Sequence, residues 1–178
     1  KYNQPLYRHT VELTLDWIAR ELTSPDGLWY SSLDADSEGS EGTYYIWSAS
    51  EVDSILGDRA EKIKKYYGIT GDGNWEQGKN VLHIPAFQEI DDELEPIRKQ
   101  LLQIRTKRIA PALDDKVITS WNGMMIKGFL HAWQGVGNPE YLNAAIRAGD
   151  FYREAIAKNG GDVFRIWKNN RFSIPGFL

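Results

Sequence analysis

Residues 16–30, DWIARELTSPDGLWY, and residues 150–165, DFYREAIAKNGGDVFR, follow the same plan. Each begins with Asp and an aromatic residue, continues in a helical pattern, turns at glycine and ends in a short aromatic stretch typical of a strand. This repeat indicates helical hairpins in which a short strand follows alternate helices. Repeats of this kind cannot bury their apolar faces alone, so neighbouring hairpins must cover them. The sequence therefore predicts a mainly α fold with short β-hairpin excursions.

The rest of the chain extends this plan. Apolar residues at helical spacing in 11–22 predict a first helix. Ser48 and Glu51 have capping-box spacing, and Asn138 precedes Pro139 as a capping residue should. Further helices are predicted over 48–57, 58–67, 86–109, 120–135 and 138–158. Hairpins are predicted over 28–47, with Tyr44 to Trp47 as the returning strand, and over 162–173, with the turn at 169–170.

The amino-acid composition limits what kind of protein this can be. The chain has 178 residues, 42% of them hydrophobic, which predicts a single domain over 1–178. Its net charge of -4 disfavours a nucleic-acid partner, and no apolar run is long enough to cross a membrane. Cysteine is absent, which excludes disulfides and thiolate metal sites from these residues and makes the cytosol the default location. No dinucleotide fingerprint is present, so we expect no cofactor.

An acidic loop precedes the predicted strand at 44–47. In DADSEGSEGTYYIW, residues 34–47, Asp34, Asp36 and Glu38 have the spacing of the first calcium ligands of an EF-hand loop. The twelfth position, where that loop needs a bidentate Glu, is Tyr45, so we expect no metal. Two interpretations remain open. The carboxylates and aromatic rings form a sugar-binding wall, or the loop is a solvated turn in which Asp side chains bind nearby backbone amides.

A second polar block lies at 114–122. Asp114, Asp115 and Lys116 are followed by Trp121 and Asn122 at the start of a predicted helix. Carboxylates bind pairs of sugar hydroxyls, and two carboxylates flanking one bond can serve as acid and base. The alternative is structural: negative charge is favoured near a helix N-terminus, and a Trp there can simply be core.

Both blocks carry a family resemblance. Residues 34–52, DADSEGSEGTYYIWSASEV, and residues 105–133, RTKRIAPALDDKVITSWNGMMIKGFLHAW, resemble the thioredoxin-domain-containing proteins of the spermatogenesis-associated protein 20 type, as does GNWEQGKNVL between them. The resemblance implies a six-hairpin (α/α) toroid, similar to N-acylglucosamine 2-epimerases and six-hairpin glycosidases, preceded by a thioredoxin-like domain. That domain and about half of the toroid are not in these residues, so the resemblance implies a fragment, which we expect to be inactive alone. Fold does not fix function, so the carbohydrate link is an analogy.

These observations lead to two hypotheses. In the first, the chain is part of a carbohydrate-active protein, isomerase-like or glycosidase-like, in which loops at one end of the toroid share a pocket for a sugar ligand. Asp36 and Asp115 are then the expected acid/base pair, and the other expected site residues are Asp34, Glu41, Tyr44, Trp47, Asp114, Lys116, Trp121 and Asn122. In the second, the toroid is a non-enzymatic scaffold that docks the thioredoxin-like domain or a client protein. The incomplete edge of the toroid is expected to expose apolar surface and to self-associate.

Overall fold

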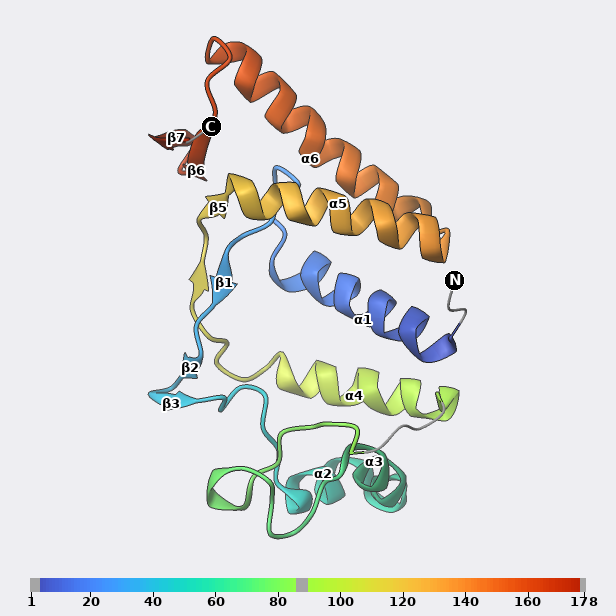
Figure 1. Ribbon diagram of the computed structural model, residues 1–178. Coiled ribbons are helices and arrows are strands. Elements are labelled where there is room, and N and C mark those ends of the chain that lie inside the picture. The colour runs from blue at the N-terminus through green and yellow to red at the C-terminus, as the bar shows by residue number, and fades with distance from the viewer. Residues whose placement is uncertain (1–3, 86–89, 177–178) are drawn as a thin grey trace. The chain divides into compact units, whose positions relative to one another are not determined.

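A computed structural model describes residues 4–85 and 90–176, which divide into two compact units. The first unit combines residues 1–33 with residues 113–178, and the second is residues 34–112. Both are mainly helical, with small antiparallel sheets (Figure 1). The prediction of a mainly α fold with short β excursions is confirmed, while the six-hairpin toroid and the single domain over 1–178 stay predictions.

Three helices build the first unit: α1 (Pro5–Glu21), α5 (Thr119–Val136) and α6 (Pro139–Lys158). Helix α5 packs against both α1 and α6. The buried side chains at their interfaces include Leu15 and Ile18 of α1, Phe129 of α5 and Ala148 of α6. The Phe129 ring stacks on Trp29, with 4.8 Å between ring centroids. The predicted inward face of the first helix is thus confirmed at Leu15 and Ile18.

Local signals explain where these helices begin and end. Gly137, with φ of 84°, ends α5 in the left-handed conformation that glycine adopts without strain. The Asn138 side chain then accepts a hydrogen bond from the Glu140 amide, and Pro139 follows at the first helical position. The predicted start of α6 is therefore confirmed.

Short strands join the helices of the first unit. Strand β1 (Ser32–Leu33) pairs antiparallel with β4 (Leu113–Asp114). A second sheet has the order β5 (Val117–Ile118), β6 (Phe164–Lys168) and β7 (Arg171–Pro175). The turn between β6 and β7 has φ of 51° at Asn169 and 56° at Asn170, as a type I′ hairpin turn requires. The predicted hairpin and its turn are confirmed.

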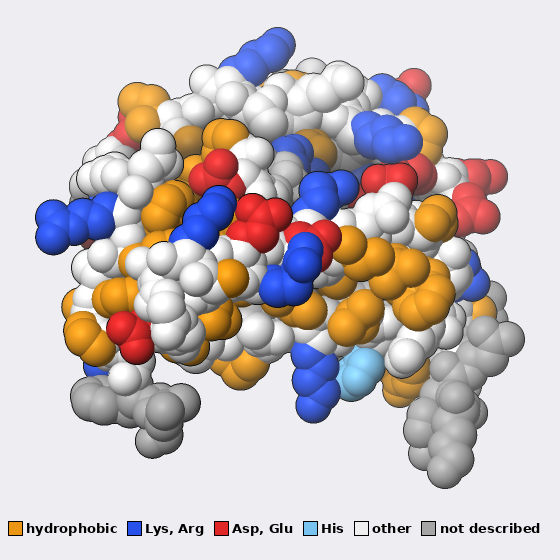
Figure 2. Space-filling model, turned by 90° about the horizontal axis from the view of Figure 1, so that it is seen from above, with side chains coloured by type: hydrophobic (Ala, Val, Ile, Leu, Met, Phe, Trp, Pro, Cys, Tyr) orange, Lys and Arg blue, Asp and Glu red, His pale blue; other side chains and the backbone are white. Residues whose placement is uncertain are grey.

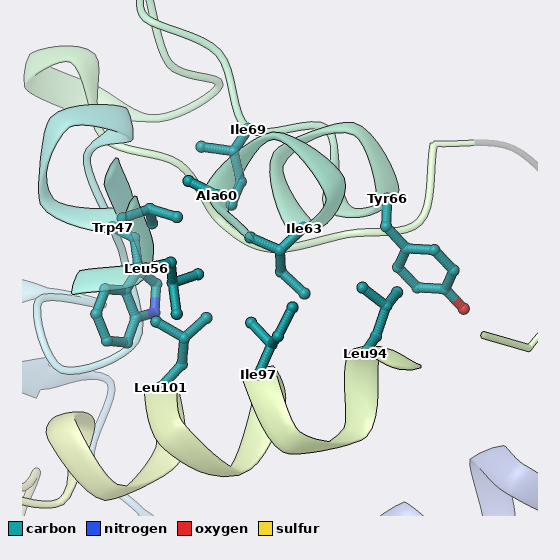
Figure 3. Close-up of a cluster of buried hydrophobic side chains, with 10 residues drawn as sticks. Trp47, Leu56, Ala60, Ile63, Tyr66, Ile69, Leu94, Ile97 and Leu101 are labelled. Carbon is teal, nitrogen blue, oxygen red and sulfur yellow. The ribbon is translucent and has the colours of Figure 1, made fainter. Parts of the chain in front are cut away.

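The second unit packs α2 (Ala49–Leu56), α3 (Ala60–Tyr67) and α4 (Glu95–Arg105) around its own core. Figure 3 shows Leu94, Ile97 and Leu101 on the α4 side of this core, facing side chains such as Ile63. The Ser48 hydroxyl accepts a hydrogen bond from the Glu51 amide, so the predicted cap of α2 is confirmed. A small hairpin, β2 (Asp36–Ser37) with β3 (Ser40–Glu41), precedes these helices.

Two predicted elements differ from the structure. The returning strand at Tyr44 to Trp47 is wrong: residues 42–45 form a turn, and only Trp47 makes a bridge, to Asn80. Tyr44 and Trp47 are β-formers, but here both are buried in loop backbone rather than paired in a sheet. The helix predicted over 86–109 is shorter, since α4 runs from Glu95 to Arg105 after a 3-10 turn at Asp92–Leu94. Residues 86–89 of that prediction lie outside the described residues.

The described surface agrees with the near balance of charges in the sequence. Acidic and basic side chains are interleaved with hydrophobic ones on the face that Figure 2 shows. Within the residues that the structure describes, no helix is both long and apolar enough to cross a membrane.

Candidate functional site

The acidic loop forms the β2–β3 hairpin of the second unit. Its two turn residues, Glu38 and Gly39, have φ of 56° and 78°, which is the left-handed conformation of a type I′ turn. Asp36 and Glu41 are opposite each other in the register, so their side chains lie on the same face of the hairpin. The Asp34 carboxylate accepts a hydrogen bond from the Asp36 amide at 3.2 Å. The turn interpretation of this loop therefore holds for Asp34, while Asp36 and Glu41 stay exposed.

Arg108 connects the segment after this hairpin to α2. Its guanidinium donates hydrogen bonds to the carbonyl oxygens of Tyr44 and Ile46, at 3.0 and 2.8 Å. It also forms an ion pair with the Glu51 carboxylate at 2.7 Å and lies 4.0 Å above the Trp47 ring. These contacts hold residues 43–47 in their turn against the start of α2. The Arg108 guanidinium thus uses both its planar set of N–H donors and its stacking face to bind other groups of the protein.

A loop at 71–80 approaches the hairpin from another part of the second unit. The amides of Asn74 and Trp75 both donate to the Lys79 carbonyl, which closes the loop. Gly73 has φ of 76°, and a Cβ there would lie 2.4 Å from the same carbonyl oxygen, so a side chain at this position would open the loop. The closed loop leaves the Trp75 side chain 39% exposed.

A pocket of about 330 Å³ lies between these segments of the second unit. It is polar for its size and includes carboxylates, two basic side chains and one indole. Its lining residues are Glu38, Ser40, Glu41, Thr43, Ile46, Glu51, Trp75, Glu76, Gln77, Lys79 and Arg108. Of the site residues predicted from the sequence, only Glu41 lines it.

Most of this lining was not predicted from the sequence. Trp75, Glu76 and Lys79 belong to GNWEQGKNVL, which carries the family resemblance but was not considered as a site. Its dense combination of an aromatic, an acidic and a basic residue resembles the other two blocks and was the available signal. Arg108 lies within residues 105–133, which carry the family resemblance, yet nothing in its local spacing indicated that it reaches back to residues 44–51.

Tyr44, Trp47 and Asn122, all predicted to bind substrate, are buried. Tyr44 and Trp47 are 4% and 2% exposed, and Trp47 belongs to the core of the second unit. Asn122, at 1% exposed, accepts a hydrogen bond from the Trp29 amide and donates one to the Trp29 carbonyl. Packing and backbone hydrogen bonds explain why these three side chains are buried, and no ligand is needed. They would therefore affect ligand binding only by positioning the backbone.

The acidic part of the second block belongs to the first unit and is engaged in ion pairs. Asp114, in β4, pairs with Lys116 at 2.9 Å, and this lysine holds the pKa of the Asp114 carboxyl below its usual value. Asp115 pairs with Lys168 of β6. Trp121, at the start of α5, is 48% exposed. Asp36 and Asp115 thus lie in different units, and their role as an acid/base pair stays a prediction.

Metal-ligating groups are sparse. Across residues 4–85 and 90–176, no three His, Asp or Glu side chains are grouped closely enough to hold a metal ion. Asp34, Asp36 and Glu38 have EF-hand-like spacing, but their backbone leads into a tight hairpin. This is not the loop geometry with which an EF-hand binds calcium.

The sequence is similar to several known proteins. It is 28% identical to the spermatogenesis-associated protein 20 of Homo sapiens, with 83% of this chain and 23% of that protein covered. The protein of the same name from Mus musculus is 26% identical over the same shares. An uncharacterised protein of Caenorhabditis elegans is 26% identical, with 79% of this chain and 24% of that protein covered. No known family profile matches the chain.

The similarity agrees with the resemblance seen in the sequence blocks. It extends over most of the chain, but the chain spans about a quarter of the length of these relatives. Their names state no reaction, substrate or ligand, so function has to be argued from the pocket itself.

Proposed function

We propose that the chain is part of a carbohydrate-active protein and that the pocket of the second unit binds a sugar. The observation that carries this proposal is the exposed Trp75 ring on a polar pocket of about 330 Å³. That volume is at the lower end of small-molecule sites, which suits a monosaccharide or one end of a longer sugar.

The lining has the chemistry that a hydroxylated ring needs. The carboxylates of Glu41 and Glu76 can each accept hydrogen bonds from a pair of hydroxyl groups. Gln77 and Lys79 supply donors for hydroxyl and ring oxygens. The indole of Trp75 offers an apolar face to the C–H surface of the ring, with a polar edge left for water.

The finer proposal is a six-hairpin toroid with isomerase-like or glycosidase-like chemistry. It retains Asp36 and Asp115 as the acid and base, and it retains Asp34, Asp114, Lys116 and Trp121 as binding residues. Two features support it: Asp36 is exposed on the same hairpin face as Glu41, and Trp121 is exposed on α5.

A titration followed by the indole NMR signals tests the sugar site. A panel of monosaccharides should shift the Trp75 indole in a saturable way. Calorimetry, which needs no indole reporter, should show that Trp75→Ala weakens binding at least about tenfold because the stacking face is lost. Tyr7→Ala is the control, since Tyr7 is also an exposed aromatic residue but lies in the other unit and belongs to neither proposed sugar site. If no monosaccharide shifts Trp75, or if Trp75→Ala binds as well as the unchanged chain, the proposal is wrong.

The alternative is a non-enzymatic scaffold that docks the thioredoxin-like domain implied by the family resemblance. What favours it is an apolar groove of about 470 Å³ between α1 and α5, lined by side chains such as Val11, Met125 and Phe129. Sedimentation of the chain mixed with such a domain distinguishes the two functions. A complex that Met125→Glu abolishes would support the scaffold, and two independently sedimenting species would remove it.

A further inference from the structure

The ligand of the pocket in the second unit can be specified further from the charges around it. We infer that this pocket is selective for a sugar that carries a protonated amine, such as a hexosamine with a free amino group. The inference rests on the proposed function, because it assigns a substrate class to the same pocket.

Arg108 does not make this pocket a site for an anion. A guanidinium on a pocket wall usually favours an anion, but this one is already neutralised by Glu51 at 2.7 Å. Its Nη1 group donates to the carbonyls of Tyr44 and Ile46, and its face covers Trp47. An anionic ligand would have to displace these contacts, which are partly buried and therefore costly to lose.

The other charges of the lining are predominantly negative. Glu38, Glu41 and Glu76 all line the pocket, and within the described parts of the chain none of them is in an ion pair. The single basic side chain left to balance them is Lys79. Three carboxylates against one ammonium group give the empty pocket an excess of negative charge, which a cationic ligand would relieve.

Trp75 points to the same class of ligand independently of the carboxylates. An indole is the aromatic ring that attracts a cation most strongly across its face, and it also stacks on the C–H face of a sugar. An amino sugar offers both features in one ring. A simple metal cation would lack the apolar face, and no three-ligand metal group is present among the described residues.

The test compares three sugars that differ at one substituent. Glucosamine, glucose and N-acetylglucosamine are titrated into the 178-residue chain, with the Trp75 indole signal as readout. Glucosamine should bind about tenfold more tightly than the two neutral sugars, a preference equivalent to one favourable charge interaction. The preference should shrink as salt is added and vanish above the pKa of the sugar amine, because screening and deprotonation remove the attraction.

Two charge variants assign the effect to the pocket. Glu41→Gln and Glu76→Gln should each weaken glucosamine binding several-fold more than glucose binding. Both sugars lose a hydroxyl acceptor in these variants, but only glucosamine also loses a charge interaction. Asp58→Asn is the matched control, because Asp58 is an exposed carboxylate of the same unit that does not line the pocket.

The outcomes separate this inference from the proposed function. If glucose and glucosamine bind equally well, the charge inference is wrong and the sugar site stands. If the preference survives in both Glu→Gln variants, its source is not this lining and the inference is again wrong. If none of the three sugars shifts Trp75, the sugar site itself is refuted, and the inference with it.

Discussion

The two units use the same device in different settings. Each contains a fully buried asparagine that holds the backbone of a buried tryptophan: Asn122 holds Trp29 in the first unit, and Asn80 holds Trp47 in the second. In the first unit, Asn122 is the partner of both the amide and the carbonyl of Trp29. In the second, Trp47 already exchanges two backbone hydrogen bonds with Asn80, and the Asn80 side chain adds contacts to Thr70.

Both tryptophans lie in one-residue bridges, and the difference is which backbone groups each bridge pairs. The bridge at Trp47 pairs its own amide and carbonyl, so the Asn80 side chain adds a bond to that carbonyl and anchors the loop that leads to Trp75. The bridge of Trp29 to Thr23 uses the neighbouring residues' groups, so the Asn122 side chain pairs the Trp29 amide and carbonyl. Buried backbone groups must be paired, and a side-chain amide can supply one donor and one acceptor in the same place.

The largest effect should come from removing these amides. Asn122→Leu would leave the Trp29 amide and carbonyl buried without partners, and we expect the free energy of unfolding to fall by about 4 kcal/mol. Asn80→Leu should cost about 2 kcal/mol, because Trp47 keeps its backbone bridge and Thr70 is exposed to water. Urea unfolding measures both.

Asn143→Leu is the control for that comparison, since Asn143 is exposed on α6 and should change stability by less than about 0.5 kcal/mol. A larger loss for Asn80→Leu than for Asn122→Leu would contradict the contrast between the two units.

A smaller effect is expected at the helix caps, one in each unit. Ser48→Ala removes the acceptor of the Glu51 amide, and Asn138→Ala removes that of the Glu140 amide. Each should lower the free energy of unfolding by about 1 kcal/mol, as measured by thermal denaturation followed by circular dichroism. Glycine also lacks the side-chain acceptor, but it leaves the helix end open to water and should cost only a few tenths of a kcal/mol. If neither Ala variant loses stability, the cap hydrogen bonds do not stabilise these helices.

The smallest effect concerns the loss of folding stability at acidic pH. Arg98 holds the pKa of the Glu95 carboxyl in the second unit below its usual value of 4.5. A carboxyl whose pKa is lowered by folding stabilises the protein fully above its unfolded pKa, and this contribution is lost as the pH falls through the lower folded value. Stability should therefore decrease on acidification below about pH 4.5, and Glu95→Gln should reduce the slope in that range.

Urea unfolding at a series of acidic pH values measures that slope. Lys116→Gln provides the corresponding test in the first unit, because Lys116 is the main cause of the lowered pKa of Asp114. An unchanged pH dependence in both variants would mean that these pairs do not contribute. The effect should be small in either unit, since both pairs are partly exposed and screened by water.

The amino-acid sequence by itself determined what depends on neighbouring residues. The helix faces at Leu15 and Ile18, the caps at Ser48 and Asn138 and the turn at Asn169 and Asn170 all depend on contacts within a few residues, and each was predicted. The exclusion of thiolate chemistry followed equally from composition alone.

Only the tertiary structure decided which polar and aromatic residues are buried. Trp47, Tyr44 and Asn122 have the composition of a binding wall in the sequence, yet distant residues bury all three. Arg108 lies over the Trp47 ring and Arg105 over the Tyr44 ring, while Asn122 binds the Trp29 backbone. The pocket of the second unit joins residues 38–51, 75–79 and 108. Long-range closure of this kind depends on packing between segments, which no local pattern of charge or hydrophobicity encodes.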